Sequence, residues 1–454
     1  MTYPERRLKI QKFNYSPNPL QVFQALSAEH DYCYLLESVE GPRKLAQYSF
    51  IGFSPTKVLD AKDHTYSEYS KDSKRIRVET KDPLSHLRSH LEQTSSYRGF
   101  RFVGGLVGYF SYDMVRYLEN LPEHTEDDLN LPDFQFGKFD DGIVFDHVTG
   151  LAYYYWYDDN RIREVRRLLS AHHASTQFSA TKCKVNLSRS EFESNVEKAK
   201  TYIKSGDIFQ VVLSKRFELD IDGSLIHFYK QLREINPSPY MYYLKMGKVS
   251  IVGSSPEMLG RVDGRQVETF PIAGTRPIGR NSAETEDLAS SLIKDPKERA
   301  EHVMLVDLAR NDVGKVCQYG SVEVPEFMTI QRYSHVQHIV SRVTGKLGPD
   351  KDSVDVLKAI FPAGTVSGAP KKRAMEIIEE LEACRRGPYA GALGYFSYNG
   401  NADFAITIRT LLAKERQAYV QVGAGIVSDS SPRREWDETE HKAGALLRAL
   451  KIEG

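Results

Sequence analysis

The sequence predicts an α+β fold built on large, mostly antiparallel sheets, and three observations lead to this prediction. Residues 1–168 contain short runs rich in aromatic and β-branched residues that alternate in polarity, as antiparallel strands do. Residues 188–450 contain several segments with the apolar period of a helix. Helices and strands in this second region do not alternate in the regular rhythm of a doubly wound parallel sheet.

The first region, residues 1–168, is expected to supply mainly strands. Its strand-like runs are DYCYLLESV, QYSFIGFSP, RFVGGLVGYFSYD and GIVFDHVTGLAYYYWY. Residues 169–187 are polar and show no helical period, so the sequence predicts a connector there. The second region, residues 188–450, is then expected to form the larger part of the protein.

The second region opens with a predicted helix. The segment SRSEFESNVEKAKTYIKSG is capped by Ser188 or Ser190 and ends at Gly206. A strand, DIFQVVLSKRFEL, and a helix, LIHFYKQLREINPS, follow it. Two further helices are predicted, one from about Lys297 in DPKERAEHVMLVDLARND and one in SPRREWDETEHKAGALLRALK near the C-terminus.

The charge balance excludes some classes of partner. The chain has 61 basic and 61 acidic residues and no basic block, whereas phosphate binding needs clustered Lys and Arg. We therefore do not expect nucleic acid or an anionic membrane as the main partner. The N-terminus lacks an apolar signal-peptide core, and no run reaches the roughly 20 apolar residues of a membrane span. The four cysteines lie far apart without a C-x-x-C pair, so we expect reduced thiols and a cytoplasmic protein.

Two pairs of glutamates are candidates for metal binding. Glu298 and Glu301 lie three residues apart on one predicted helix, and Glu435 and Glu438 have the same spacing on the last helix. Such a pair is ordinarily an ion-paired, solvated surface. Two pairs on different helices would instead offer oxygen ligands to Mg²⁺, which is usually held by one or two carboxylates with substrate oxygens and water. The spacing alone leaves both interpretations open.

Glycine turns, an arginine and a histidine are candidates for ligand contacts. The turns lie in TFPIAGTRPIG, in FPAGTVSGAPK before a predicted helix, and in the strand VQVGAGIVSDS, where they allow close backbone approach or offer free N–H groups. In the strand FAITIRTLLA, Arg409 is expected to share a face with Ala405 and Thr407. His338 either moves protons in a pocket or is a hydrogen-bonded core histidine. The other features have structural alternatives: the glycine turns would be plain turns, the glycines in the strand would mark a bulge, and Arg409 would extend its charged end to solvent.

Taken together, these motifs resemble one family in their order along the chain. The motifs are GGLVGYFSYD, GDIFQVVLSKR, NPSPYMYYL, GSSPEML, PIAGT, EHVMLVDLARND, FPAGTVSGAPK, GAGIVSDS and EWDETEHK. They resemble the chorismate-utilising enzymes over about residues 35–450. The resemblance implies a four-layer αββα sandwich with an active site between the ends of the sheets. It also implies that 1–168 is the N-terminal region and 188–450 the chorismate-binding catalytic region.

The resemblance assigns the glutamates to a metal. Mg²⁺ would be bound by Glu301 and Glu438, with Glu298 and Glu435 beside them, and would hold the ring carboxylate of chorismate. Chorismate carries two carboxylates, so a neutral protein must supply local positive charge. By the resemblance, that charge would come from Mg²⁺ and Arg409.

The resemblance also implies catalytic and substrate-binding residues. Glu257 of SSPE resembles the general acid that assists departure of the C4 hydroxyl, which requires a carboxyl group kept protonated. His338 matches a histidine associated with the later elimination of pyruvate. The remaining residues would hold the enolpyruvyl carboxylate or line the site: Gly274, Thr275, Thr365, Tyr389, Arg409, Gly423, Ala424 and Gly425.

Within the family, the motifs most resemble those of enzymes that make anthranilate and pyruvate from chorismate and ammonia, on the way to tryptophan. Aminodeoxychorismate synthases, which aminate C4 on the folate route, typically carry PIKGT where this chain has PIAGT. A methyl group at Ala273 keeps the approach to C2 open for ammonia, and this favours anthranilate. Relatives that use water, and a non-catalytic amino-acid-binding protein on the same fold, are further alternatives.

The resemblance implies two partners besides chorismate and ammonia. No cysteine begins the G-x-C-x-G-x-Q pattern of a glutaminase nucleophile, so the use of glutamine would require a separate glutamine amidotransferase subunit. The segments LLES and NPSPYMYYL resemble the two that form the site of L-tryptophan, the feedback inhibitor. The inhibitor residues would be Ser38, Pro239, Tyr240 and Met241. Ordinary strand packing is the alternative for both segments.

Overall fold

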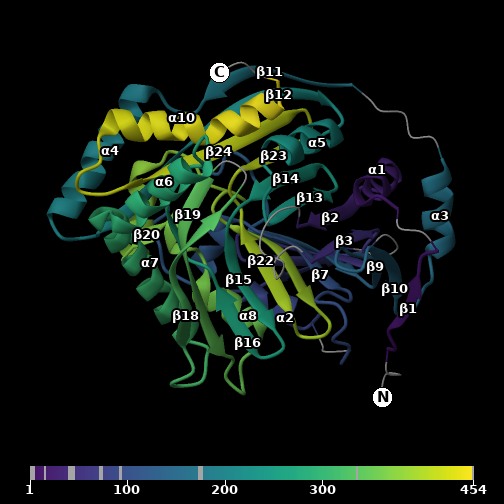
Figure 1. The fold of residues 1–454 in the computed structure, drawn as a ribbon. Helices are drawn as coiled ribbons and strands as arrows, with labels where there is room; N and C mark the ends of the chain where they lie inside the picture. The colour runs from purple at the N-terminus through teal and green to yellow at the C-terminus, as the bar shows by residue number, and fades with distance from the viewer. Residues whose placement is uncertain are drawn as a thin grey trace.

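The strands of this protein form two large sheets, sheet A and sheet B (Figure 1). The computed structural model describes residues 6–14, 17–38, 47–70, 75–91, 95–171, 177–333 and 336–451. Within these ranges each sheet has 12 strands. The α+β class with large antiparallel sheets, predicted from the sequence, is therefore confirmed.

Sheet A combines strands from both ends of the chain, and its neighbouring strands pair antiparallel. The strands are β1 (Lys9–Lys12), β2 (Tyr32–Glu37), β3 (Tyr48–Phe53), β9 (Asp141–Asp146), β10 (Leu151–Trp156), β11 (Phe178–Val185), β12 (Gln210–Gly223), β13 (Tyr240–Met246), β14 (Val249–Ser255), β20 (Gly368–Ala369), β23 (Thr410–Lys414) and β24 (Gln417–Ile426). Their order is β1-β10-β9-β3-β2-β13-β14-β23-β24-β12-β11, with β20 beside β12.

Sheet B is also antiparallel and also mixes the two ends of the chain. The strands are β4 (Lys57–Lys62), β5 (Thr65–Tyr69), β6 (Ile76–Glu79), β7 (Gly105–Phe110), β8 (Phe134–Phe139), β15 (Met258–Asp263), β16 (Gln266–Thr269), β17 (Ile272–Pro277), β18 (Glu323–Arg332), β19 (Val336–Lys346), β21 (Ala392–Ser397) and β22 (Ala402–Ile406). Their order is β17-β19-β16-β15-β22-β21-β7-β8-β4-β5-β6, with β18 beside β19.

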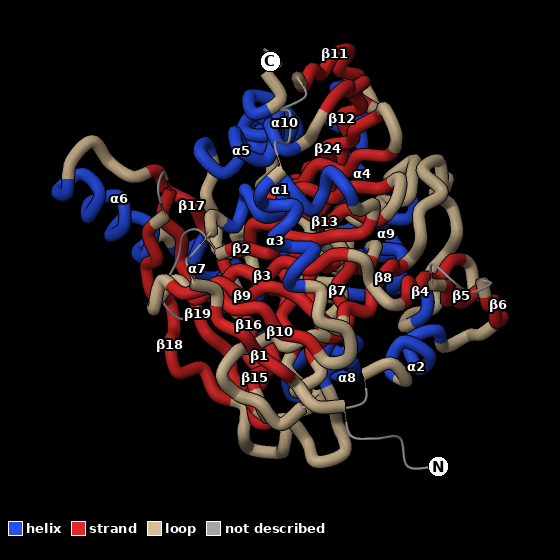
Figure 2. Tube along the Cα trace, turned by 90° about the vertical axis from the view of Figure 1, so that its right-hand side faces the viewer, coloured by secondary structure: helices blue, strands red, loops and turns tan. Residues whose placement is uncertain are grey.

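Helices cover the outer face of each sheet (Figures 1 and 2). Those that pack on sheet A are α1 (Pro19–Glu29), α3 (Ile162–Ser170), α4 (Arg189–Lys204), α5 (Ile226–Ile235), α9 (Lys371–Leu381) and α10 (Pro432–Ala449). Those that pack on sheet B are α2 (Pro83–Arg88), α6 (Ser282–Lys294), α7 (Pro296–Gly314) and α8 (Ser353–Ile360). Two short 3₁₀ turns are η1 (Tyr112–Tyr117) and η2 (Gly364–Val366).

The two sheets bury a hydrophobic cluster between them. Tyr34 and Tyr242 from sheet A and Tyr109 and Tyr395 from sheet B belong to this cluster. Separate clusters lie between sheet A and its helices and between sheet B and its helices. Layers of helix, sheet, sheet and helix follow one another, so the structure is the expected four-layer αββα sandwich.

Local sequence explains where the main helices begin. The side chain of Ser188 accepts from the backbone N–H of Glu191, whose carboxylate accepts in return from the backbone of Ser188, so a capping box starts α4. Asp295 caps α7 and Pro296 occupies its first turn, where the missing N–H costs nothing. The predicted cap at Ser188 is therefore confirmed.

The predicted connector at 169–187 differs from the structure. Strand β11 occupies part of it and pairs along β12 at the edge of sheet A. The run FSATKCKV alternates, but it is short and largely polar, so it carries little hydrophobic signal. Its partner supplies the hydrogen bonds that fix it. Both sheets also contain strands from 1–168 and from 188–450, so the two regions share their hydrophobic cores.

Candidate active site

Two neighbouring crossovers between the sheets carry Glu257 and Arg409. Glu257 lies between β14 of sheet A and β15 of sheet B, and Arg409 lies between β22 of sheet B and β23 of sheet A. The backbone N–H of Ile406 donates to the carbonyl of Glu257 at 3.0 Å, and that of Ser254 donates to the carbonyl of Arg409 at 3.1 Å. These bonds hold the two crossovers side by side.

Glu257 has the properties of a buried acid. Its side chain is 8% exposed, and its Oε1 accepts a hydrogen bond from the Thr365 hydroxyl at 2.8 Å. Burial raises the pKa of Glu257 to about 7, although Thr365, Arg409 and Lys442 each oppose the shift. Near neutral pH this carboxyl group therefore holds a proton in a large fraction of molecules.

Arg409 does not lie on the continuous strand expected from FAITIRTLLA. Strand β22 ends at Ile406, and Arg409 adopts a φ of 49°, a left-handed conformation that is uncommon for a residue with a side chain. The expected shared face with Ala405 and Thr407 is therefore wrong. Within the described residues its guanidinium makes no hydrogen bond or ion pair, and Glu257 is its main electrostatic neighbour. A half-buried guanidinium of this kind is suited to an anionic ligand.

His338 is held in one tautomer. Its Nδ1 lies 2.8 Å from the carbonyl oxygen of Gly274 and 3.1 Å from the hydroxyl of Thr275. A carbonyl oxygen only accepts, so Nδ1 carries the proton and Nε2 keeps its lone pair. Burial, with a contribution from Arg409, lowers the pKa of His338, so the ring is neutral and Nε2 is available as a base.

Glycines allow close contacts along the strands of the site. A Cβ at Gly423 would lie 2.6 Å from the Tyr389 hydroxyl, and one at Gly425 would lie 2.6 Å from the side-chain nitrogen of Gln210. Gly274 has a φ of 66°, and a Cβ there would meet Glu298 at 2.9 Å. These glycines therefore bring bare backbone against polar side chains.

The candidate metal ligands on α7 and α10 lie close enough for the charges of Glu301 and Glu438 to interact between the two helices. Burial raises the pKa of Glu301, and the nearby charges of Glu298 and Glu438 raise it further. Burial and Glu438 likewise raise the pKa of Glu435. Such mutual repulsion is relieved by a bound cation.

The carboxylates are not gathered into a closed cage. Among the residues described, no group of three or more His, Cys, Asp or Glu side chains is placed to hold a metal ion. Glu298 pairs with Arg276 at 3.2 Å, and Glu438 pairs with Lys442 at 2.7 Å. The donor set fits Mg²⁺ held by one or two carboxylates and completed by substrate oxygens and water.

Comparison with known proteins decides the family. The profile of the chorismate binding enzymes matches residues 31–448. The chain belongs to this family. It is 49% identical over 436 residues to anthranilate synthase component 1 from Methanothermobacter marburgensis, an alignment that covers 96% of this chain and 93% of the relative.

Solved structures of chorismate-binding enzymes share the fold. The crystal structure of anthranilate synthase component I from Streptococcus pneumoniae superposes with a TM-score of 0.80 at 36% identity, covering 90% of this chain and 94% of that one. The menaquinone-specific isochorismate synthase from Escherichia coli has a TM-score of 0.74 at 18% identity, covering 98% of this chain and 94% of the other. The second likeness concerns the fold alone. This chorismate-binding enzyme is thus similar in sequence and structure to anthranilate synthase component 1.

Sequence reasoning missed two polar residues of the site in this chorismate-binding enzyme. Gln210 donates to Glu301 at 3.2 Å and packs beside Gly425. Lys442 donates to the carbonyl of Gly423 at 2.9 Å and also pairs with Glu438. Both residues lie in motifs that resemble the family, GDIFQVVLSKR and EWDETEHK. Their place in these motifs could have identified them as site residues.

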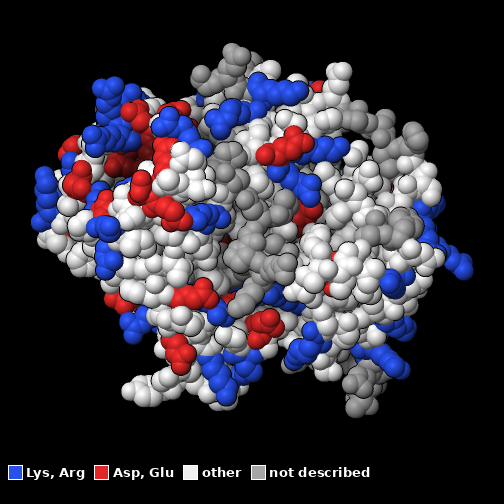
Figure 3. All heavy atoms as spheres, in the orientation of Figure 1, with Lys and Arg blue, Asp and Glu red and all other residues white. Residues whose placement is uncertain are grey.

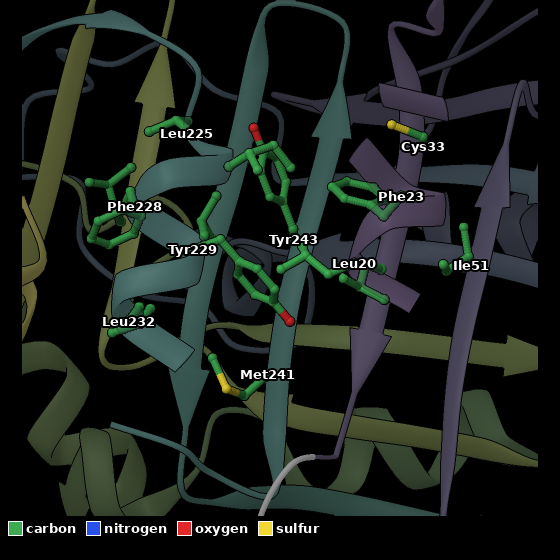
Figure 4. Packing of buried hydrophobic residues seen from close by; sticks show 14 of the residues in the cluster. Leu20, Phe23, Cys33, Ile51, Leu225, Phe228, Tyr229, Leu232, Met241 and Tyr243 are labelled. Carbon is green, nitrogen blue, oxygen red and sulfur yellow. The ribbon is translucent and has the colours of Figure 1, made fainter. Parts of the chain in front are cut away.

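The segments expected at the inhibitor site do meet. The Ser38 hydroxyl donates to the carbonyl of Pro239 at 2.7 Å. Tyr240 and Met241 follow on β13 and point to opposite faces of sheet A, as neighbours on a strand do. The Tyr240 hydroxyl donates to Asp403 at 2.8 Å, whereas Met241 is buried under α5 in the helix-facing core (Figure 4). Two of the expected inhibitor residues, Tyr240 and Met241, therefore lie on opposite faces of sheet A.

The surface of this chorismate-binding enzyme agrees with its balanced composition. On the face shown in Figure 3, basic and acidic side chains are interspersed, and acidic ones gather in the upper left, where α4 and α10 lie in Figure 1. No helix in the described ranges is long and apolar enough to cross a membrane.

Proposed function

We propose that this enzyme makes anthranilate and pyruvate from chorismate and ammonia. The observation that carries the proposal is the buried Glu257, with a pKa of about 7 and a hydrogen bond from Thr365, placed beside the unpaired guanidinium of Arg409. Removal of a hydroxyl group from a dicarboxylate requires an acid and a cation that binds a carboxylate. Glu257 and Arg409 can fill these two roles from neighbouring crossovers. The similarity to anthranilate synthase component 1 supports this choice among chorismate reactions.

Amination begins with the protonated Glu257. As ammonia forms a bond to C2, the C4–O bond breaks, and the departing hydroxyl takes the proton of Glu257 and leaves as water. Arg409 and the hydroxyl of Tyr389 bind the enolpyruvyl carboxylate, and the backbone from Gly423 to Gly425 approaches it closely. The new ammonium group on C2 loses a proton to give the amine.

Elimination of pyruvate needs a base. Nε2 of His338 carries a free lone pair and removes the proton on C2. The electrons of that C–H bond form the ring double bond as the C3–O bond breaks, and the enolpyruvyl group leaves as the enolate of pyruvate. The enolate then takes a proton on its methylene carbon to become pyruvate, which balances the proton that His338 removed. Formation of the aromatic ring makes this step strongly favourable. Gly274 and Thr275 keep the imidazole in the required tautomer.

Mg²⁺ fits the carboxylates of α7 and α10. Glu301 and Glu438 would hold it, with Glu298 and Glu435 as neighbours. When bound, the metal supplies positive charge to the ring carboxylate of chorismate. Gln210 fixes the orientation of Glu301 through its hydrogen bond, and Lys442 does so for Glu438.

Ala273 favours amination at C2 over amination at C4. Its side chain is buried next to Gly274 on β17, opposite Ile339 of β19. A lysine at this position would fill the space beside the ring and offer a competing nucleophile. Ammonia needs no such group, so a methyl side chain suits the proposed reaction. Formation of aminodeoxychorismate, with nitrogen on C4, is the second candidate.

Two partners complete the proposal. A separate glutamine amidotransferase subunit would supply ammonia, because none of the four cysteines has the sequence context of a glutaminase nucleophile. L-Tryptophan would act as feedback inhibitor where Ser38 meets Pro239. The relatives are named component 1, which agrees with the existence of a second component.

The direct test is an assay of the purified chain with chorismate, Mg²⁺ and an ammonium salt. We expect equimolar anthranilate and pyruvate, and no product when glutamine replaces ammonium. Adding a glutamine amidotransferase subunit is expected to confer activity with glutamine. Chorismate consumption without pyruvate release would contradict the proposed function.

A further inference from the structure

Two charged residues in recognised motifs form an ion pair that the proposed chemistry does not use. Asp312 lies near the C-terminal end of α7 and is 6% exposed, and Lys371 is the first residue of α9. Lys371 Nζ donates to the Asp312 carboxylate at 2.6 Å and to the carbonyl of Ile360 at 3.2 Å. Lys315, on the solvent side, also donates to Asp312, at 2.9 Å.

A cavity of about 50 Å³ extends from the Asp312 side of this pair to the candidate acid. Its lining includes Glu257 and Thr365, and it also includes Asp312 and Ile360. A buried water needs about 10–15 Å³ measured in this way, so the cavity has room for about three. The remaining lining is mainly apolar, which confines a polar path to the few groups that Glu257, Thr365 and Asp312 provide.

The reaction creates a need for such a path. In each turnover Glu257 gives its proton to the departing C4 hydroxyl, and the carboxylate must regain a proton before the next one. The ammonium group formed on C2 loses a proton to solvent, so solvent gains and returns one proton and the balance closes. Glu257 is 8% exposed, and bound chorismate would cover it from the substrate side.

We propose that the Asp312–Lys371 pair returns a proton to Glu257 through the cavity after each turnover. This inference rests on the proposed function. The Lys371 ammonium gives a proton to the Asp312 carboxylate that it contacts, and Asp312 passes a proton through water in the cavity to the Glu257 carboxylate. The amine of Lys371 is then reprotonated from the side of Lys315.

The charges around Lys371, at the donor end of the path, favour release of its proton. Burial lowers the pKa of Lys371, and Lys315 lowers it further, while Asp312 and Glu119 raise it. An ammonium group of lowered pKa gives up its proton more readily than an exposed lysine does.

At the other end, Thr365, Arg409 and Lys442 face Glu257 and favour its charged form. Burial outweighs these three groups and raises the pKa, so after each transfer to substrate the Glu257 carboxylate readily takes a proton back from a donor within reach. The ordinary alternative is that the ion pair only ties α7 to α9.

Lys371→Arg separates the two roles. The guanidinium keeps the positive charge and the hydrogen bonds to Asp312, but its pKa above about 12 prevents it from releasing a proton. A purely structural pair therefore tolerates this substitution, whereas a proton donor does not. Lys371→Met removes both the charge and the donor and serves as the second variant.

The experiment is rapid mixing of enzyme with excess chorismate and ammonium, followed by anthranilate fluorescence. The enzyme is first held at about pH 6, below the Glu257 pKa of about 7, so that the acid starts protonated. For Lys371→Arg we expect one anthranilate per enzyme at the wild-type rate, and then a steady state slower by about tenfold. Deuterated water is expected to slow the second phase more than the first, because the second phase contains the return of a solvent-derived proton in addition to the transfer from Glu257.

A matched control is Glu379→Gln. Glu379 also lies on α9 and is buried in an ion pair, with Arg116, but neither member of that pair lines the cavity, whereas Asp312 does. This variant is expected to lose stability without a burst. Equal slowing of the first and later turnovers in Lys371→Arg, or no slowing at all, would overturn the proton route. Absence of anthranilate from the wild type would instead overturn the proposed function.

Discussion

At the scale of single residues, the site depends on two groups whose pKa values are moved by burial in opposite directions. Burial raises the pKa of Glu257 to about 7 and keeps an acid available. Burial lowers the pKa of His338 and keeps a base available. Pairs of titratable groups with separated pKa values mark the acid and base of an enzyme. The motif SSPE pointed to Glu257, but only the fold shows why it is protonated.

Glu257→Gln tests the acid. An amide cannot protonate the C4 hydroxyl, so kcat is expected to fall by about 10²–10⁴-fold in the anthranilate assay. The folded-state pKa lies above the usual 4.5, so the wild type loses stability as pH rises from about 4.5 to 7. Removing this charge is therefore expected to stabilise the variant relative to wild type by up to about 3 kcal/mol at pH 8, measured by urea unfolding. A variant with wild-type kcat would exclude Glu257 as the acid.

The pH dependence of kcat/KM follows from the same two groups. Activity is expected to fall above about pH 7, because the Glu257 carboxyl loses its proton there. On the acidic side, His338 stays neutral until the pH reaches its lowered pKa. We therefore expect kcat/KM to stay constant at pH values somewhat below the usual pKa of histidine. A profile that rises steadily from pH 6 to pH 9 would contradict both assignments.

At the scale of elements, helices α7 and α10 each present two glutamates at a spacing of three residues. The sequence predicted both helices and placed each pair on one face, because helical periodicity and capping are local properties. It left open whether the pairs face each other, since that depends on how distant segments pack. Strand β11 was missed for a related reason, because its register comes from β12.

Mg²⁺ is expected to stabilise the folded enzyme before any substrate is added. A ligand that binds only the folded state at about 100 times its Kd stabilises by about 2.7 kcal/mol, seen as a rise in Tm. Glu438→Gln is expected to remove most of this rise and most activity. Asp437→Asn on the same helix is the control and is expected to keep both, because Asp437 forms only an exposed ion pair with Arg189, at 3.8 Å. Full turnover in EDTA would contradict a metal site.

At the scale of the whole molecule, the chain crosses repeatedly between two sheets. Glu257 and Arg409 lie in adjacent crossovers, and this juxtaposition of residues far apart in sequence could not be read from local pattern. Asp312 and Lys371 were likewise present in quoted motifs without an expected role. The resemblance to chorismate-utilising enzymes predicted which residues form the site. The distances between these residues and their burial, which only the fold shows, explain what they can do chemically.

Inhibition by L-tryptophan tests the place where Ser38 meets Pro239. The hydrogen bond from Ser38 to Pro239 joins the end of β2 to the start of β13. Ser38→Ala removes the hydroxyl and is therefore expected to weaken inhibition about tenfold while kcat stays unchanged. Ser49→Ala removes another buried hydroxyl of sheet A, one that bonds His147, and is expected to leave inhibition intact. Equal inhibition of all three proteins would place the inhibitor elsewhere.

The central claim is that the nitrogen of ammonia is placed on C2 of chorismate. The most direct measurement is the NMR spectrum of the product formed by the wild-type enzyme from chorismate and ¹⁵N-labelled ammonium. We expect labelled anthranilate, with the nitrogen ortho to the carboxylate, and one pyruvate for each labelled product. Label on C4, as in aminodeoxychorismate, or an unlabelled hydroxylated product would contradict this claim.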